Sequence, residues 1–390
     1  MSVFQVVEKS QKAVIKVIGV GGCGGNAVDH MIEKNVMGVD FICANTDLQA
    51  LKKSQASTIV QIGEELTKGL GAGSRPDTGK QAAIDDEEKI IEAISGADML
   101  FIAAGMGGGT GTGATPVIAQ IAKKLGILTV AIVTKPFNFE GTRTQVALEG
   151  IKELVNHVDS LITIPNEKLM GVLGDDVNFV DAFGAANNVL YAAVDGIAEI
   201  INKPGLINVD FADVKTVMSE MGMAVIGSGF AEGPERASIA WKEAVACPLL
   251  EDVNLNNAKG ILVNISASSD FKMREHFEVM ENIKKYAAGN ATIIVGCVID
   301  DTMTNSLRVT MVATGLSQNN QPIQDDVITS FSSLDKTEDN NDEKDDTVSE
   351  SDNESELNVF ASNDDGDEVN NFESTSDDKY DIPTFLRNNK

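Results

Sequence analysis

The first 165 residues alternate between short apolar runs and amphipathic stretches. The apolar runs are AVIKVIGV, VDFICANT, TIVQIG, DMLFIAAG, LTVAIVT and SLITIP. The helical stretches between them include GGNAVDHMIEKN, DDEEKIIEAISG and TPVIAQIAKKLG. Apolar strands that alternate with helices are typical of a parallel sheet that is buried on both faces. The pattern therefore predicts an α/β domain with a Rossmann-like sheet.

A long helix is predicted over residues 178–202, and Pro204 and Gly205 end it. Its apolar residues recur at spacings of three and four, which predicts one buried stripe along the helix. The residues of this stripe are Phe179, Phe183, Ala186, Leu190, Val194, Ile197 and Ile201.

The pattern changes near Ala224. GILVNISA, TIIVGCVID and LRVTMVATG are predicted strands, REHFEVMENIKKYAA is a predicted helix, and Trp241 lies in a further helical stretch where we expect it to pack in a core. We expect a second, smaller α/β domain joined to the first by the long helix. The expected segments are a flexible N-terminus (1–12), the first domain (13–177), the long helix (178–203), a loop and helix (204–223), the second domain (224–317), a linker (318–379) and a tail peptide (380–390).

Charge is distributed unevenly along the chain. Residues 325–381 hold 21 acidic residues and three lysines, so this segment carries −18 of the formal net charge of −28. Such a segment has little to bury and repels itself, which predicts a disordered linker. No basic patch stands out, which argues against nucleic acid as the main ligand.

The cysteine pattern and the hydropathy of the chain indicate in which cellular compartment the protein is expected. Cys23, Cys43, Cys247 and Cys297 form no CxxC pair, so a zinc site and a disulfide framework are not expected. The N-terminus lacks the apolar core of a signal peptide, and no apolar run is long enough to span a bilayer. We expect a soluble protein of the reducing cytoplasm.

Two glycine-rich turns follow apolar strands and precede helices. The first, GVGGCGGNA (19–27), contains GxGxxG, and Asp47 follows at the end of the second strand. This is the outline of a dinucleotide-binding turn, although a purely structural turn stays open.

The second turn is GMGGGTGTGA (105–114), with Pro116 placed as for the first turn of the following helix. Backbone N–H groups at two helix N-termini, side by side at the carboxyl ends of parallel strands, predict a site for phosphates. The sequence lacks GxxxxGK[ST], so this site is not a P-loop.

The segment GGGTGTG resembles the signature loop of the tubulin/FtsZ family of GTPases, and the similarity extends from about Ala13 to Leu316. It includes NTDLQAL, KGLGAG, VTKPFNFEG, AFGAANNVL and PGLINVDFADVKTVMSEMG, and it resumes in DIPTFLR. The resemblance implies a GTP-hydrolysing, filament-forming cytoskeletal protein that assembles at the cell-division site, on the inner face of the membrane at midcell.

The resemblance also implies roles for individual residues. It implies phosphate and Mg²⁺ contacts near the glycine turns and the second strand, ribose contacts in FNFEGTR, a base contact on the long helix and hydrolytic residues after it. The implied GTP-binding residues are Gly22, Cys23, Gly24, Gly25, Asn26, Asn45, Asp47, Gly108, Gly109, Thr110, Gly111, Glu140, Arg143, Phe183 and Asn187, and the implied catalytic residues are Asn208, Asp210 and Asp213. The resemblance implies that Mg²⁺ is held by the phosphates of GTP, without a direct protein ligand. Its contact to Asp47 would be bridged by water.

Several of these residues also have structural interpretations. Asn45 to Asp47 also fits a capped turn, and Asp210 to Asp213 before a helix fits N-cap chemistry. FEGTR is one residue shorter than in relatives, so Arg143 is either the matching arginine or a solvated neighbour. The long helix carries the chain about 35 Å from the start of the helix before the two aspartates are reached, so we do not expect them to reach a phosphate of their own chain. The resemblance implies that their loop enters the nucleotide site of the next subunit.

The tail and the histidines complete the set of candidates. The resemblance implies that Asp381, Ile382, Pro383, Phe385, Leu386 and Arg387 bind membrane adaptors of the FtsA and ZipA type, alongside other division-site regulators, so that membrane contact is indirect. An unstructured end is the alternative. His30, His157 and His276 are expected at the surface or as caps.

Two other functions remain open from the sequence. A nicotinamide-dependent dehydrogenase would use the GxGxxG turn and Asp47, but it leaves the second glycine turn unexplained. A scaffold that binds GTP only to polymerise would release no phosphate.

Overall fold

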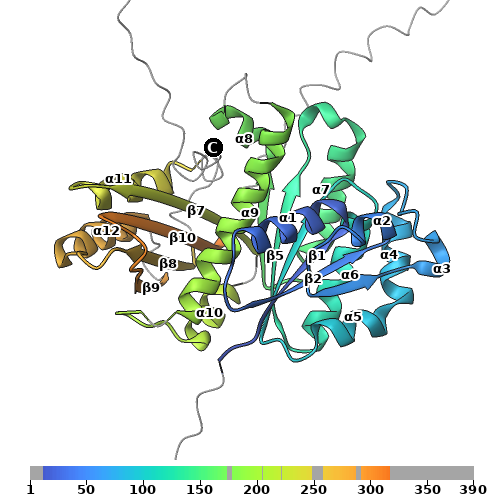
Figure 1. The fold of residues 1–390 in the computed structure, drawn as a ribbon, viewed down its shortest axis with the longest axis horizontal. Helices are drawn as coiled ribbons and strands as arrows, with labels where there is room; N and C mark the ends of the chain where they lie inside the picture. The colour runs from blue at the N-terminus through green and yellow to red at the C-terminus, as the bar shows by residue number, and fades with distance from the viewer. Residues whose placement is uncertain are drawn as a thin grey trace, which may run out of the picture. The chain divides into compact units, whose positions relative to one another are not determined.

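The computed structural model describes residues 12–173, 178–203, 205–220, 222–247, 258–286 and 291–316 (Figure 1). Residues 1–11 of the expected N-terminus, the acidic linker and the tail peptide lie outside the described residues. The expected organisation of those three segments therefore stays a prediction.

The described strands form one sheet in the order β3-β2-β1-β4-β5-β6-β7-β10-β8-β9. Strands β1 to β6 pair in parallel, as the alternating pattern predicted. Strand β10 runs antiparallel to both β7 and β8, so the sheet as a whole is mixed. The strands are β1 (Ile15–Val20), β2 (Val39–Asn45), β3 (Thr58–Gln61), β4 (Met99–Gly105), β5 (Leu128–Lys135), β6 (Ser160–Pro165), β7 (Gly222–Glu232), β8 (Gly260–Ala267), β9 (Thr292–Ile299) and β10 (Ser306–Leu316).

Helices cover both faces of this sheet (Figure 1). Side chains of α1, α9 and α10 share one core with the strands, and those of α4, α5, α6 and α7 share a second core on the other face. The helices are α1 (Gly21–Glu33), α2 (Leu48–Leu51), α3 (Glu64–Thr67), α4 (Pro76–Asp85), α5 (Glu87–Ile94), α6 (Thr110–Lys124), the 3₁₀ helix η1 (Asn138–Glu140), α7 (Thr142–Leu154), α8 (Asn166–Leu173), α9 (Phe179–Asn202), α10 (Phe211–Met218), α11 (Arg236–Val245) and α12 (Met273–Tyr286).

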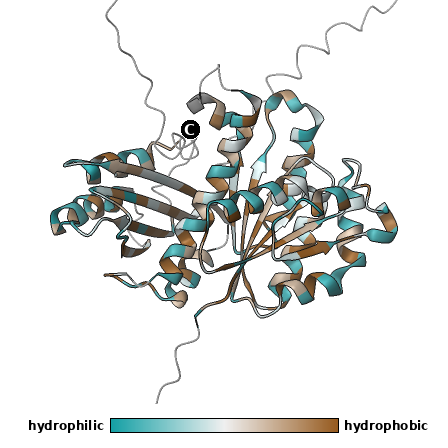
Figure 2. Cartoon of the chain, in the orientation of Figure 1, coloured by the Kyte–Doolittle hydropathy of each residue, from teal (hydrophilic) through white to brown (hydrophobic). Residues whose placement is uncertain are grey.

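The central strands are apolar along their length, and the helices carry their polar residues away from the sheet (Figure 2). Leu100, Ile102 and Val133 are fully buried in strands that have helices on both sides. Continuous apolar runs are what such two-sided burial requires. The predicted α/β class is therefore confirmed.

The long helix α9 begins where the sequence predicted. The side chain of Asn178 accepts a hydrogen bond from the N–H of Asp181 at 2.9 Å and caps the helix. Leu190, Val194 and Ile197 are fully buried, as the stripe predicted, but Phe183 is 37% exposed. The prediction of burial was wrong for Phe183, and the side chain of Phe179 lies outside the described part of the chain.

The C-terminal strands have a core of their own with α11 and α12. Trp241 is 4% exposed within it, which confirms the expected packing role. Helices α9 and α10 contribute to the core on the other face, which also contains Leu262 and Val312 of β8 and β10. Helix α9 therefore packs against strands from both halves of the chain.

Two elements differ from the predicted ones. Strand β7 was not predicted, although it joins the two halves through a short parallel pairing of Leu161 with Met223 and antiparallel pairing with β10. Helix α6 begins at Thr110, inside the second glycine-rich turn, so Pro116 lies within the helix rather than in its first turn. The glycines here were interpreted as a loop, but the start of the helix includes Gly111 and Gly113.

Candidate nucleotide site

The carboxyl ends of the parallel strands bring the two glycine-rich turns together. A Cβ added to Gly21 would lie 3.0 Å from the backbone N of Gly111, so the two turns touch through their backbones. At the same edge, Thr46 Oγ1 at the end of β2 lies 2.7 Å from Thr110 Oγ1. The predicted convergence at this edge is the arrangement in which open α/β sheets bind ligands.

The glycines of the first turn are required for two different reasons. Gly21 has φ +73°, a backbone conformation that other residues rarely adopt. A Cβ on Gly24 would lie 2.3 Å from the carbonyl oxygen of Ala103, so this glycine lets α1 pack on β4. Only Gly22 has no atom within 4 Å of its Cβ position, and it faces open space at the helix N-terminus.

In the second glycine-rich turn, too, some glycines are required by backbone conformation or close packing, and one faces open space. Gly107 has φ +97°, and a Cβ on Gly111 would lie 2.5 Å from the carbonyl oxygen of Gly105. A Cβ on Gly109 would lie 2.8 Å from both Ala72 Cβ and Arg75 N, so this glycine faces protein. Gly108 faces open space.

Helix α6 starts at Thr110, directly after Gly108 and Gly109, and its first N–H groups have no partner within the helix. Such groups, with the positive end of the helix dipole, favour an anion. Gly22 and Gly108 mark where an anion can approach the two helix starts without meeting a side chain, because nothing lies within 4 Å of either Cβ position.

Cys23 lies between the glycines of the first turn and is only partly exposed. Its Sγ lies 3.5 Å from Thr134 Oγ1, and it occupies the space that a side chain on Gly105 would need. Burial raises the pKa of the Cys23 thiol, so the thiol stays protonated. The side chain therefore fits by packing against Gly105.

The polar turn after β2 has the geometry of a helix cap. Asp47 Oδ1 accepts hydrogen bonds from the N–H groups of Gln49 and Ala50 at 2.8 and 3.2 Å and caps α2. Asn45 is 3% exposed and accepts a hydrogen bond from the N–H of Asp47 at 3.3 Å. Both Asp47 bonds use Oδ1, which leaves Oδ2 for another contact.

Glu140 and Arg143 form an ion pair of 2.7 Å at the start of α7. Glu140 also accepts a hydrogen bond from the N–H of Phe137 at 2.9 Å. The arginine is mostly exposed, so this pair adds little stability by itself. It holds the guanidinium close to the loop that leads out of β5.

An aromatic cluster lies beside this loop. Phe183 of α9 packs edge to face against Phe137, with ring centroids 5.6 Å apart, and Phe139 stacks on Phe137 at 5.1 Å. Phe139 is 71% exposed. Asn187 lies one turn after Phe183 and is partly exposed. The sequence analysis missed Phe137 and Phe139, although two phenylalanines around a polar residue in FNFE were a visible signal.

The three polar residues expected to be catalytic lie after α9, away from this cluster. Asp210 Oδ1 accepts the N–H of Asp213 at 2.8 Å and caps α10, as the structural interpretation predicted. Asn208 accepts the N–H of Gly205 at 2.7 Å. The neighbouring Ile207 pairs with Cys297 of β9, which places this loop beside the C-terminal strands. The structure therefore does not bring Asp210 and Asp213 to the glycine turns of the same chain.

The histidines and cysteines are not arranged for metal binding in the described part of the chain. There, no group of three His, Cys, Asp or Glu side chains could hold a metal ion, and none of the four cysteines forms a disulfide. His30 bonds Asn188 at 2.7 Å. Both ring nitrogens of His276 are buried without a hydrogen-bond partner, so the expectation of a surface or capping role was wrong for this residue.

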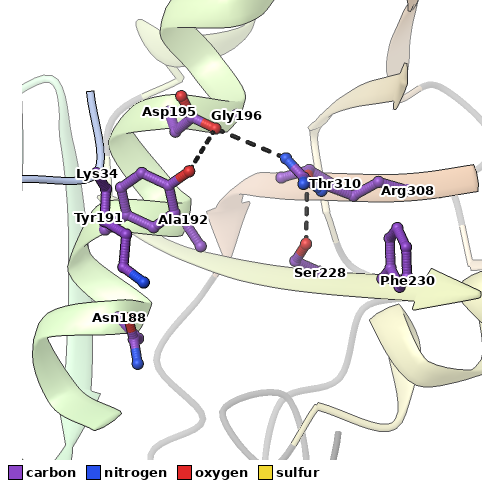
Figure 3. A pocket seen from close by; sticks show the side chains of 10 residues that line it. All are labelled: Lys34, Asn188, Tyr191, Ala192, Asp195, Gly196, Ser228, Phe230, Arg308 and Thr310. Atoms are coloured by element: carbon purple, nitrogen blue, oxygen red, sulfur yellow. Dashed lines mark hydrogen bonds and ion pairs between the residues drawn. The ribbon is translucent and has the colours of Figure 1, made fainter. Parts of the chain in front are cut away.

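A cavity of about 240 Å³ lies between α9 and strands β7 and β10 (Figure 3). Asp195 accepts a hydrogen bond from Tyr191 at 3.3 Å and lies 3.7 Å from Arg308. Burial and the nearby Asp195 carboxylate raise the pKa of Tyr191 to about 12. None of the predicted site residues lines this cavity.

Comparison with known families agrees with this geometry. The model of the tubulin/FtsZ family GTPase domain matches residues 14–174, and that of the FtsZ family C-terminal domain matches residues 222–317. Fold and site define the class: this is a tubulin-like GTPase. The alternative of a nicotinamide-dependent dehydrogenase is not supported.

Individual relatives narrow the class further. The chain is 60% identical to the cell division protein FtsZ of Pseudomonas aeruginosa over 315 residues, or 80% of each chain. It is 50% identical to that of Wigglesworthia glossinidia brevipalpis over 389 residues, or 99% of each. An FtsZ dimer from M. jannaschii superimposes with a TM-score of 0.75 at 44% identity, covering 79% of this chain and 89% of that one. The chain belongs to the FtsZ family.

No helix within the described residues is long and apolar enough to cross a membrane.

Proposed function

We propose that this chain is a cell-division protein that polymerises head to tail and hydrolyses GTP at the contacts between subunits. The observation that carries the proposal is the separation of the two halves of the site. The glycine turns lie at the carboxyl edge of the sheet, and Asp210 and Asp213 follow α9, a helix of 24 residues or about 36 Å. A contact that repeats from one subunit to the next without closing builds a filament.

The phosphates of GTP are proposed to lie against the N-termini of α1 and α6. Gly22 and Gly108 leave room for them, Gly24 and Gly111 let the surrounding backbone pack closely, and Gly25 leaves space for the side chain of Cys43. Backbone N–H groups from Cys23 in the first turn, and from Gly109 and Thr110 in the second, would donate to phosphate oxygens, and the exposed side-chain amide of Asn26 would donate beside them.

Nucleoside recognition is proposed for the loop after β5 and for α9. Arg143, held by Glu140, would contact the ribose, and the exposed edge of Phe183 would pack on the base. Asn187, one helical turn further on, carries both amide donors and a carbonyl acceptor, as recognition of guanine requires.

Mg²⁺ fits this donor set as a companion of the phosphates. It keeps several waters and binds phosphate oxygens rather than a cage of protein ligands. The cap of α2 does not use Asp47 Oδ2, which would accept a hydrogen bond from a metal-bound water, with Asn45 beside it in the chain. When bound, Mg²⁺ would neutralise charge on the phosphates.

Asp213 is proposed to orient the attacking water in the site of the neighbouring subunit, with Asp210 and Asn208 holding the loop. The test measures GTP turnover against protein concentration for the parent, for Asp213→Ala, and for Asp301→Ala, which removes an exposed acid elsewhere. Parental turnover per subunit should rise above an assembly threshold, and Asp213→Ala should bind GTP and polymerise but hydrolyse poorly.

A mixing experiment tests whether the site is shared. Gly108→Val places a side chain in the open space of the pocket without a clash in the protein, so it should fold but not bind GTP. Mixed with Asp213→Ala, each nearly inactive alone, it should recover turnover wherever its loop meets an intact pocket. Full parental activity at concentrations too low for association would refute the proposal. Phosphate release by assembled protein would exclude a scaffold that only binds GTP.

The tail peptide, residues 380–390, is proposed to bind membrane adaptors of the FtsA and ZipA type and so to hold filaments at midcell, on the inner face of the membrane. The acidic linker would separate it mechanically from residues 13–317. Deleting residues 381–390 should leave turnover and filaments intact and abolish adaptor binding. Loss of assembly in the truncated protein would count against this role.

A further inference from the structure

Thr46 lies where three segments of the nucleotide site meet. It is fully buried at the end of β2, between Asn45 and Asp47. Its hydroxyl oxygen lies 2.7 Å from that of Thr110, the first residue of α6. Its carbonyl oxygen accepts hydrogen bonds from Gly71 N, at 3.2 Å, and from Thr67 Oγ1, also at 3.2 Å.

These contacts fix the position of the Thr46 hydroxyl. The hydrogen bonds from Thr67 and Gly71 fix the carbonyl group of Thr46. Thr46 also follows directly after the last residue of β2, which is paired in the sheet. A threonine has few χ1 rotamers, so a fixed backbone leaves its hydroxyl few directions. The hydroxyl of Thr110 therefore meets a partner whose place is already set.

The direction of the hydrogen bond between the two hydroxyls depends on the ligand. Each hydroxyl has one proton to donate, and a phosphate oxygen can only accept. When Thr110 donates its proton to a phosphate, Thr46 must be the donor to Thr110. A hydroxyl that accepts one hydrogen bond donates a stronger one. Thr46 thus polarises Thr110 toward an anion.

We propose that Thr46 is a positioning residue for nucleotide binding, which acts by holding and polarising the Thr110 hydroxyl. The inference rests on the proposed function, in which Thr110 meets a phosphate of GTP. Thr46 itself, with no exposed surface, does not contact the ligand.

The test compares GTP affinity among matched variants. Thr46→Val removes the hydroxyl and keeps the shape, and it should weaken GTP binding roughly three- to tenfold, the range expected for one hydrogen bond. Thr46→Ser keeps a hydroxyl and should bind within about twofold of the parent. The control is Thr314→Val, because Thr314 is also fully buried and donates to the Val217 carbonyl at 2.8 Å, far along the chain from the glycine turns. It should lose stability without losing GTP affinity.

A second comparison separates positioning from general destabilisation. In a Thr110→Val background, Thr46→Val should weaken GTP binding no further, because the residue through which it acts is gone. Additive losses in the double variant would overturn the proposal. Should Thr46→Val not fold, Thr46→Ala removes the hydroxyl without adding a methyl group beside Thr110, and the same comparisons apply.

The two proposals fail in different ways. If the parent binds no GTP, the proposed function itself is wrong. If the parent binds GTP and folded Thr46→Val binds it equally well, only the positioning role of Thr46 is overturned.

Discussion

Replacing Gly105 with alanine should destabilise the protein because Cys23 already occupies the space. A Cβ on Gly105 would lie 2.6 Å from Cys23 Cβ and 2.9 Å from its Sγ, where ordinary contacts are 3.4–4 Å. The Cβ of Cys23 is fixed to the backbone of α1, so relief requires the helix to move. Overpacking of this kind costs about 1–3 kcal/mol. In a Cys23→Gly background the nearest remaining atom would be Thr134 Oγ1 at 3.5 Å, an ordinary contact.

Urea unfolding of the parent, the two single variants and the double variant measures this coupling. Gly105→Ala should lower the free energy of unfolding by about 1–3 kcal/mol when residue 23 is cysteine and by close to nothing when it is glycine. The coupling energy between the two positions should therefore equal most of the loss in the single Gly105→Ala variant. Gly184→Ala is the control, because nothing lies within 4 Å of its Cβ position in α9. Gly184→Ala should raise the free energy of unfolding by up to about 1 kcal/mol through the higher helix propensity of alanine, and by the same amount in both backgrounds. A coupling energy near zero for Gly105 and Cys23 would refute the packing argument.

Two further predictions concern groups outside the nucleotide site. Arg236 is 1% exposed and donates two hydrogen bonds to Glu275, at 2.7 and 3.1 Å. Arg236→Met should therefore lower the free energy of unfolding in urea by about 3–5 kcal/mol, whereas Lys80→Met, at an exposed ion pair, should lower it by less than about 1 kcal/mol. Equal losses in the two variants would contradict this prediction. The pKa of Tyr191 is raised to about 12, above its unfolded value of about 10, so its contribution to stability is complete below pH 10 and is lost as pH rises toward 12. Ultraviolet titration should show one tyrosine with a pKa of about 12 that disappears in Tyr191→Phe, and titration of every tyrosine near pH 10 would contradict the burial argument.

The strands of the first half could be predicted from sequence because burial on both faces leaves a continuous apolar run. Strand β7 lacked that signal, since Gly222, Gly227 and Gly229 interrupt MGMAVIGSGFAE. The structure gives a reason for one of them: a Cβ on Gly229 would lie 2.1 Å from the carbonyl oxygen of Ala240 in α11. A glycine that permits a helix to cross a strand looks, in sequence, like a break in the strand.

In the glycine-rich turns, as in β7, the sequence does not reveal which glycines are required by close packing. Their position at strand ends predicted correctly where the turns meet, but not which glycines face a ligand. Gly113 is required because a Cβ there would lie 1.9 Å from the carbonyl oxygen of Pro76, where α4 crosses α6. The glycine cluster is therefore explained largely by close packing, and Gly22 and Gly108 alone within the two turns face open space. Gly109→Val would accordingly disturb the segment at Ala72 before it met a phosphate.

The packing of α9 explains why, under the proposed arrangement, one chain does not complete its own site. Leu190, Val194 and Ile197 are fully buried in the core that α9 shares with both sets of strands. Moving the loop after α9 to the glycine turns would unpack these side chains, and losing such a side chain from a core costs about 2–5 kcal/mol each. The hydrogen bond from Asp213 N to Asp210 already orders the loop at the start of α10. A second subunit therefore meets a preformed loop, so association brings the two halves together without a large rearrangement of either.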